Sequence, residues 1–361
     1  QLRAEKAPNQ KWIGVTGTNG KTTTVEMTAA IVKAAGIKAV ACGNVGDTVI
    51  DAVDRDDPYE VLVLELSSFQ LHWAKEANFV AAAILNIADD HLDWHGSFEA
   101  YADAKFSILD RTGVAILNAD DGAVVTRANR FTDRKVFFSL NTPAPGEIGV
   151  VEELLVDRAF VADPQQASMI CELVDIVPTV PHNVSNALAA AALARAINVP
   201  HEAIQKALRE FRPGRHRIET VLEKDGIVWI DDSKATNPHA AIASLLSYFN
   251  VIWIAGGLAK GASMDELAKR AGSRIKSIIL IGQDREIIAQ AFAQYSPTTQ
   301  LVRVDQSSDA KQLMKDVVVE AKKTAKSGDT VLLAPACASM DQFDSYVERG
   351  QLFAQAIKEL V

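Results

Sequence analysis

"WIGVTGTNGKTTT", residues 12–24, joins a short apolar run to a glycine-rich stretch that ends in one lysine and three threonines. The residues before Gly17 are largely β-branched or aromatic, which favours a strand. The following stretch, "KTTTVEMTAAIVKAAG" (21–36), predicts a helix that ends at Gly36. A strand, a glycine-rich loop and a helix in this order are typical of phosphate-binding α/β proteins. The stretch therefore predicts an α/β fold with a nucleotide site at its first loop.

This loop supplies the groups that a triphosphate needs. Glycines let backbone N–H groups approach the phosphates, the ammonium group of Lys21 neutralises them, and the Thr22 hydroxyl can bind Mg²⁺. The strict G-x-x-x-x-G-K-[ST] motif needs glycine at position 15, where this chain has Val15. A glycine-rich turn without a ligand is the alternative. The residues expected to contact ATP here are Gly17, Thr18, Asn19, Gly20, Lys21, Thr22 and Thr23.

Short apolar runs alternate with helical patterns along the chain, which predicts a mostly parallel sheet. The segment 130–182 is less regular, and we interpret it as an irregular or small antiparallel section. "FRPGRHRIE" (211–219) combines Pro, Gly and basic residues between a helix and further strands, which is typical of a domain boundary. We expect a central ATP-binding P-loop domain at 1–213. We expect a Rossmann-like, doubly wound domain at 214–361.

Composition restricts the possible partners. The chain has 361 residues and a formal charge of −9, so it lacks the basic field that would hold nucleic acid or an anionic membrane surface. It contains no apolar run of the length that spans a bilayer, and no basic and apolar signal segment. Its three cysteines have no metal-ligand spacing, which fits a reducing compartment. We expect a cytoplasmic protein that acts on small molecules.

Acidic residues and histidines follow two of the predicted strands. Glu65 ends "YEVLVLE", where a parallel strand delivers its last side chain to the ligand edge of the sheet, and it is a candidate Mg²⁺ ligand. After "ILNI" the sequence continues "ADDHLDWH". In this cluster of Asp89, Asp90 and Asp93, His91 is a candidate metal or phosphate ligand, whereas a structural role is favoured for His95. An ordinary acid at a strand end is the alternative for Glu65.

Seven motifs in this order resemble the Mur ligases: "GTNGKTTT", "LELSSFQL", "ADDHLDWHGSFEAYADAKFSIL", "HNVSNALAA", "GRHRIE", "DDSKATNP" and "PACASMDQF". The resemblance covers nearly the whole chain. "ELSSFQL" and "DSKATN" are similar to the members that add D-glutamate. The resemblance implies ATP-dependent ligation of D-glutamate to UDP-N-acetylmuramoyl-L-alanine through an acyl phosphate, for the synthesis of the cell-wall peptide. It also implies two Mg²⁺ ions.

The resemblance assigns roles to individual positions. Lys105 matches a carbamylated lysine that acts as a metal ligand beside Thr22, Glu65 and His91. Asn183 and Asn186 match amides on the adenine side of ATP, although Asn183 could instead cap a helix. Arg217 matches a hinge arginine at the phosphates, and Asp232 an acid that holds the ribose. The implied catalytic residues are Lys21, His91, Lys105 and Lys234, and the implied substrate contacts are Asn44, Ser67, Thr236, Lys260, Ser339, Met340 and Tyr346.

Several of these positions have plain alternatives. Asn44 could be a turn residue, and Lys234 and Lys260 could be solvated surface charges. Cys337 is interpreted as a small packing residue, because acyl-phosphate chemistry needs no thiol nucleophile.

The resemblance also leaves one part of the family pattern unmatched. Mur ligases normally begin with a domain that binds the uridine diphosphate of the substrate, and no segment of 1–361 corresponds to it. We therefore expect this chain alone to bind the muramyl nucleotide poorly, and to be a monomer. The alternative functions are a Mur ligase or folylpolyglutamate synthase that adds another amino acid, and a P-loop ATPase module that ligates nothing.

Overall fold

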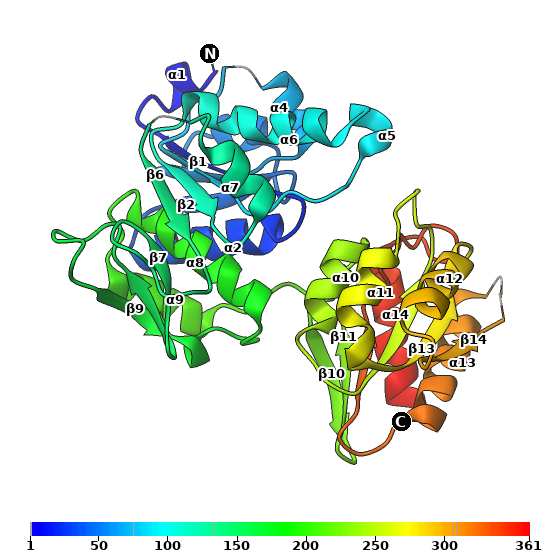
Figure 1. Cartoon of the computed structure of the whole chain (residues 1–361). Helices are drawn as coiled ribbons and strands as arrows, with labels where there is room; N and C mark the ends of the chain where they lie inside the picture. Colours follow the sequence, from blue (N-terminus) through cyan, green and yellow to red (C-terminus); the bar gives the residue numbers. More distant parts are fainter. Residues whose placement is uncertain (1, 75, 132, 306, 308) are drawn as a thin grey trace. The chain divides into compact units, whose positions relative to one another are not determined.

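The computed structural model describes residues 2–74, 76–131, 133–305, 307 and 309–361. The chain forms two compact units, Gln1–Pro213 and Gly214–Val361 (Figure 1). Both are mixed α/β structures with mostly parallel sheets, so the predicted fold class is confirmed. Among the described residues, no helix is long and apolar enough to cross a membrane.

The first unit is built on a nine-stranded sheet in the order β2-β3-β1-β4-β5-β6-β7-β8-β9. Its first six strands are parallel. Their bounds are β1 Lys11–Thr16, β2 Ala39–Gly43, β3 Val61–Glu65, β4 Ala81–Ile84, β5 Ala115–Asn118 and β6 Lys135–Phe138. Since β1 lies between β3 and β4, the loop after β1 lies at the same sheet edge as the ends of those two strands.

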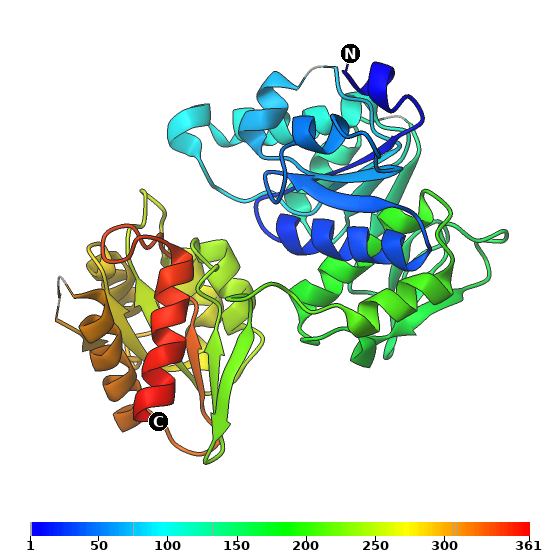
Figure 2. The ribbon, with the colours of Figure 1, turned by 180° about the vertical axis from the view of Figure 1, so that it is seen from behind.

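Helices cover both faces of this sheet. Ile13, Val15 and Val63 pack on the face of α2 (Lys21–Ala34), α8 (Pro181–Arg195) and α9 (His201–Glu210), which lie side by side in Figure 2. Leu62 and Leu64 pack on the other face. The other helices of the unit are α1 Leu2–Lys6, α3 Val49–Val53, α4 Ser68–Trp73, α5 Leu92–His95, α6 Phe98–Phe106 and α7 Gly122–Ala128. Alternation along the strands thus buries both faces.

The less regular segment 130–182 extends the same sheet. β6 is parallel to β5, and β7 Ile148–Val151 is parallel to β6, whereas β8 Leu154–Asp157 and β9 Ser168–Glu172 add an antiparallel end. The predicted antiparallel section is present, but it does not form a separate sheet. The possibility that Asn183 caps the next helix is wrong. α8 begins two residues earlier, at Pro181, with Val180 as its N-cap.

The second unit has a six-stranded sheet in the order β10-β11-β15-β12-β13-β14. The bounds are β10 Glu219–Lys224, β11 Ile227–Asp231, β12 Val251–Gly256, β13 Ile275–Ile281, β14 Gln300–Arg303 and β15 Thr330–Leu333. β10 is antiparallel to β11, and the other pairings are parallel. The chain runs outward from β12 through β13 to β14, whereas β15 returns to lie between β11 and β12. The order of a doubly wound sheet reverses at such a position.

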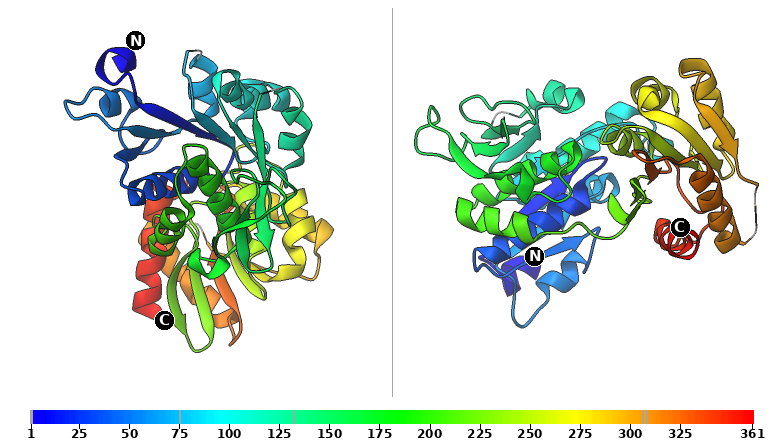
Figure 3. Two further views of the ribbon diagram at one scale, coloured as in Figure 1. Left: turned by 90° about the vertical axis from the view of Figure 1, so that its left-hand side faces the viewer. Right: turned by 90° about the horizontal axis from the view of Figure 1, so that it is seen from below.

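Helices again cover both faces of the second sheet. α14 (Tyr346–Leu360) packs beside α13 (Ala310–Thr324), as the right panel of Figure 3 shows in red and orange. The other helices are α10 Pro238–Leu245, α11 Asp265–Ala271 and α12 Arg285–Tyr295. Trp253 on β12 contacts Phe292 of α12 on the face opposite to α13. The motif loops described below lie at the carboxyl ends of β11, β12 and β15.

Candidate active site

The loop between β1 and α2 has a backbone that favours glycine. Gly20 is the N-cap of α2 with φ 82°, in the left-handed region, and a Cβ atom there would lie 2.5 Å from Oδ1 of Asn186. Asn86, two residues after the end of β4, binds this loop twice: its Oδ1 accepts a hydrogen bond from Asn19 N at 2.8 Å, and its Nδ2 donates to Asn19 O at 3.1 Å. Asn86 was not among the residues predicted for the site, although a polar residue close to a strand end was the available signal.

The Lys21 side chain folds back over its own loop. Its Nζ donates hydrogen bonds of 2.9 Å to the carbonyl oxygens of Gly17 and Thr18. The hydroxyl of Thr18 contacts Tyr101 OH at 3.0 Å, and Thr18 N donates to Asn86 O at 2.9 Å. The ammonium group therefore lies where the loop would surround phosphate oxygens.

Lys105 lies against the same loop, although it comes from α6. It is 2% exposed, and its Nζ donates a 2.9 Å hydrogen bond to Gly17 O and lies 4.7 Å from the centroid of the Tyr101 ring. Burial first, and then repulsion by Lys21, lower the pKa of Lys105 well below its usual value, whereas Asp90 and Glu65 oppose the shift. A lowered pKa increases the fraction of the amine that is neutral and therefore nucleophilic. Lys105 is therefore not a solvated surface lysine.

Glu65 ends β3 at the same sheet edge and is 3% exposed. Its Oε1 accepts a 3.0 Å hydrogen bond from Asn44 Nδ2, while its Oε2 is buried without a hydrogen-bond partner among the described residues. A buried carboxylate oxygen without a donor is costly unless a cation or ligand satisfies it. The carboxylate therefore fits a metal ligand. Asn44, expected as a substrate contact, donates this hydrogen bond to Glu65, and its contact with the substrate stays a prediction.

His91 and Ser67 lie beside this group. His91 has φ 53° and is the N-cap of α5, with its Nε2 3.6 Å from Asp90 Oδ2 and its ring 4.8 Å from the Phe69 ring. Ser67 caps α4 by a reciprocal capping box with Gln70, so its hydroxyl already has a structural role.

The remaining histidine of this segment has the structural role favoured for it. His95 contacts Ser68 Oγ at 2.9 Å and stacks on Phe69. The side chain of Asp93 lies outside what the structure describes.

The two asparagines of α8 are both buried. Asn186 lies against the phosphate loop, where its Oδ1 accepts a 3.3 Å hydrogen bond from Thr24 Oγ1. Asn183 Nδ2 donates a 2.9 Å hydrogen bond to Pro178 O. Thus Asn186 belongs to the loop environment, whereas the contact described for Asn183 is with its own preceding turn.

In the second unit, three loops meet where β11, β12 and β15 end. Residues 257–260 pair with 335–340 through reciprocal hydrogen bonds between Leu258 and Ala338, of 2.9 and 3.0 Å. Ala336 N donates to Ala235 O at 3.0 Å, which connects 335–340 to 232–237. Ligands of doubly wound proteins bind at this edge, near the reversal of strand order. The expected glutamate-binding residues Lys234, Thr236, Lys260, Ser339 and Met340 all lie on these loops.

Two lysines on these loops, Lys234 and Lys260, have exposed side chains. A ligand with negative charge could therefore reach them. Lys234 Nζ lies 4.1 Å from the centroid of the Tyr346 ring, so this pair, matched from two distant motifs, is in contact. Lys260 is exposed with φ 50°, and Met340 is 72% exposed, whereas Ser339 is buried. The loops thus present both charge and donors.

Asp232 is held inside the second unit. Its carboxylate accepts hydrogen bonds from Ser244 Oγ and, at 3.3 Å, from Ile218 N. Burial raises the pKa of Asp232 to about 7; Asp231 adds to the shift, and the charge of Arg217 opposes it. Arg217 and Asp232 therefore lie within electrostatic range of each other. The sequence suggested neither the burial nor the Ser244 contact.

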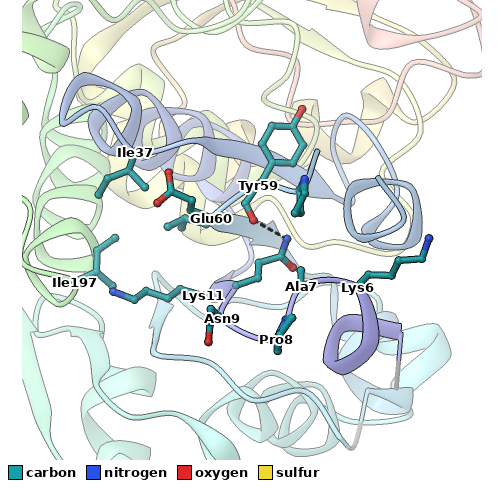
Figure 4. Close-up of a pocket in the computed structure, with 12 residues that line it drawn as sticks. Lys6, Ala7, Pro8, Asn9, Lys11, Ile37, Tyr59, Glu60 and Ile197 are labelled. Carbon is teal, nitrogen blue, oxygen red and sulfur yellow. Dashed lines mark hydrogen bonds between the residues drawn. The ribbon is translucent and has the colours of Figure 1, made fainter. Parts of the chain in front are cut away.

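A separate pocket of about 360 Å³ lies at the other edge of the first sheet (Figure 4). Its lining includes Lys11 and Val61, the first residues of β1 and β3, together with Tyr59 and Glu60. The phosphate loop follows Thr16, the last residue of β1, and Glu65 is the last residue of β3, so both lie at the opposite ends of these strands. The pocket is therefore distinct from the candidate active site.

Comparisons with known proteins agree with this geometry. The Mur ligase middle domain matches residues 15–194, and the Mur ligase glutamate ligase domain matches 216–337. The chain therefore belongs to the Mur ligase family. It is 51% identical over 355 residues to a UDP-N-acetylmuramoylalanine–D-glutamate ligase of Streptomyces avermitilis, covering 97% of this chain and 76% of that protein. A protein with the same name from Thermobifida fusca is 50% identical, with the same coverage.

Solved structures share the fold. A pseudomurein peptide ligase type C of Methanothermus fervidus superposes with a TM-score of 0.73 at 20% identity, covering 100% of this chain and 80% of that one. The MurF ligase of Thermotoga maritima in complex with ADP gives a TM-score of 0.69 at 19% identity, covering 100% and 83%. At these identities the likeness extends to the fold alone.

Proposed function

We propose that this chain catalyses the ATP-dependent ligation of D-glutamate to UDP-N-acetylmuramoyl-L-alanine, a step of peptidoglycan precursor synthesis. The observation that carries the proposal is that two lysines from distant segments, Lys21 and Lys105, donate to one carbonyl of the phosphate loop, that of Gly17. A carboxylate and a triphosphate repel each other, and the ammonium group of Lys21, together with cations bound beside Lys105 and Glu65, would hold both. The family and the names of the relatives at about 50% identity support the same reaction.

The reaction has two steps. An oxygen of the alanyl carboxylate attacks the γ-phosphorus of ATP, an O–P bond forms, and ADP leaves with the electrons of the broken bond. The amine of D-glutamate then attacks the acyl carbon of this acyl phosphate, a C–N bond forms, and phosphate leaves while the nitrogen loses a proton. Lys21 and the loop N–H groups would bind the phosphates in the first step.

The described residues fit Mg²⁺, and we propose two ions. Glu65 offers a buried oxygen that has no hydrogen-bond partner among the described residues, and Thr22 and His91 would supply further ligand atoms on the same sheet edge. Bound Mg²⁺ would neutralise the charge that accumulates between ATP and the carboxylate. Asn44 would orient Glu65 for this role.

We further propose that Lys105 is carbamylated. The neutral amine, available because burial lowers its pKa, would attack the carbon of CO₂; an N–C bond forms, one C–O π bond shifts its electrons to oxygen, and a proton leaves the nitrogen. The product is an anion in place of a cation. It would remove the repulsion by Lys21 and add an oxygen ligand near Glu65. Mass spectrometry after trapping with a carboxyl-methylating reagent in ¹³C-bicarbonate would detect it.

The second unit would bind D-glutamate. Lys234 and Lys260 would pair with its two carboxylates, and Thr236, Ser339 and the backbone of Met340 would donate hydrogen bonds. Tyr346 would hold Lys234 in place. For ATP, Arg217 would contact the phosphates, Asp232 the ribose, and Asn183 and Asn186 the adenine side. We also propose that the protein is a monomer and that it acts in the cytoplasm, and its free buried cysteines agree with the second of these proposals.

The product separates this function from its alternatives. With both substrates, the mass of a glutamyl amide supports the proposal, whereas ADP and phosphate alone would favour an ATPase module. Replacing D-glutamate by L-glutamate, L-alanine or meso-diaminopimelate in an ADP assay tests the other ligase activities. Lys21→Ala should abolish amide formation, and undiminished synthesis would refute the assignment of the loop.

A further inference from the structure

Arg349 is a fully buried arginine that the proposed reaction does not use. It lies in the first turn of α14 and is 0% exposed. Its Nε donates to Ser233 Oγ at 2.9 Å, one terminal nitrogen donates to Ser233 O at 2.9 Å, and the other donates to Cys337 O at 3.2 Å. The guanidinium therefore joins two loops that are more than 100 residues apart in sequence.

These two loops are the ones that carry the expected glutamate-binding residues. Ser233 directly precedes Lys234, and Cys337 lies two residues before Ser339. The Ser233 hydroxyl, which accepts from Arg349, donates in turn to Tyr346 O at 2.7 Å. Arg349 thus fixes the backbone beside Lys234 and the start of the helix that carries Tyr346, the ring that Lys234 contacts.

A second buried pair, His216 and Asp231, also holds the loop that contains Ser233. His216 Nδ1 and Asp231 Oδ2 are 2.6 Å apart, and Asp231 Oδ1 accepts a 2.9 Å hydrogen bond from Ser233 N. α14 passes so close that a Cβ atom on Gly350 would lie 2.2 Å from His216 Nδ1. Ser233 is therefore held through its N–H, its carbonyl and its hydroxyl, and its loop has little freedom to move.

Burying a guanidinium is costly, and apolar residues of similar volume often stabilise a fold as well or better. Burial lowers the pKa of Arg349 to about 10, so it still carries its charge at neutral pH. A planar group with several donors can hold two backbone segments at a fixed separation, which neither lysine nor an apolar side chain can do. The hydrogen bonds of Arg349 to two backbone segments therefore indicate a positioning role, because packing alone would not need a charged side chain here.

We propose that Arg349 is a positioning residue for D-glutamate, which holds the loop of Lys234 and Thr236 in register with the loop of Ser339 and Met340. The inference rests on the proposed function. A pocket that binds two carboxylates depends on the distance between its donors, and a displacement of about 1 Å can cost about a hundredfold in rate. Loss of Arg349 should therefore weaken the use of D-glutamate specifically, and not the activation of the muramyl substrate.

The test compares Arg349→Lys and Arg349→Met in the full chain through two reactions. The first is amide formation with D-glutamate as the varied substrate, at saturating ATP and muramyl nucleotide. The second replaces D-glutamate by hydroxylamine, which captures the acyl phosphate as a hydroxamate without the glutamate pocket. The control is Lys276→Met, which breaks the 2.6 Å ion pair with Asp329 at the opposite end of the same sheet.

We expect Arg349→Lys to raise KM for D-glutamate by about tenfold, and Arg349→Met to raise it further, because lysine keeps one donor group. Hydroxamate formation should stay within about twofold of wild type in both variants, and the control should change neither readout. An unchanged KM, or an equal fall in both reactions, would overturn the inference alone. A wild-type chain that forms hydroxamate but no glutamyl amide would overturn the proposed function and, with it, the inference.

Discussion

The raised pKa of Asp232 should make the stability of the second unit depend on pH. It is buried, its carboxylate accepts from Ser244 and Ile218, and its pKa rises from 3.8 to about 7. The folded state therefore binds a proton more tightly than the unfolded state does. The contribution of Asp232 to the free energy of unfolding is therefore most favourable below pH 3.8, and it is lost as the pH rises through about 7. Asp232→Asn removes this titration and keeps an oxygen acceptor for Ile218 N.

The magnitude follows from linkage. With pKa values of 3.8 and about 7, the ionisation of Asp232 costs the folded state about 2 kcal/mol at pH 5 and about 4 kcal/mol at pH 8, relative to a neutral side chain. The stability gained by Asp232→Asn over wild type should therefore be larger at pH 8 by about 2 to 3 kcal/mol. Any hydrogen bond that asparagine loses affects both pH values equally and cancels in this difference.

The assay must report the second unit alone, because the two units can unfold separately. Hydrogen exchange in urea, followed by mass spectrometry on peptides from β12, gives the free energy of unfolding of that sheet at pH 5 and pH 8. Peptides from β4 in the first unit provide the internal control. A stability difference that changes by less than about 0.5 kcal/mol between the two pH values would refute the raised pKa.

Three further outcomes are expected. Gly20→Ala should weaken ATP binding at least about tenfold by calorimetry, because φ 82° strains alanine and its Cβ would meet Asn186; unchanged affinity would contradict the loop geometry. Burial lowers the pKa of His182 to about 4, so the first unit should lose stability as the pH falls from 6.5 to 4, and His182→Gln should flatten this dependence in urea titrations. Iodoacetamide at pH 8 should modify none of the three cysteines in the folded chain and all of them in urea, since burial raises each pKa to about 12.

Much of the fold could be predicted from local patterns. The run ending at Thr16, the glycines that follow and the helical stretch up to Gly36 specify one strand–loop–helix unit, and the structure contains it with nearly the same bounds. Glu65 was expected at a strand end because its strand is continuously apolar, as buried parallel strands are. These predictions needed only short-range information.

Other features depend on partners that are distant in sequence. β10 (Glu219–Lys224) was not predicted, because it is a half-exposed edge strand whose residues lack a regular apolar alternation. Its pairing with β11 is what defines it. Likewise, local sequence does not reveal that β7 to β9 continue the main sheet and do not form one of their own, since only the pairing of β6 with β7 decides this.

Partners that are distant in sequence also limited the prediction of the site. The motifs indicated Lys21, Glu65 and Lys105, but not what holds them: Asn44 on Glu65, or Tyr101 beneath Lys105. A lysine in a nine-residue helical segment is normally solvated, and only the tertiary structure buries this one. Arg349 gave no signal at all, because an arginine in the first turn of a helix is usually exposed.

The groups that carry the proposed chemistry are buried in surroundings that lower the stability of the folded chain. Water would keep the Lys105 amine protonated and the Asp232 carboxyl ionised at neutral pH, and burial opposes both states. Glu65 likewise keeps one oxygen for which the described part of the chain provides no donor. Each arrangement lowers the stability of the free chain, and each would be relieved when CO₂, a metal ion or a nucleotide binds. Ligand binding should therefore stabilise this chain by more than the new contacts alone would provide.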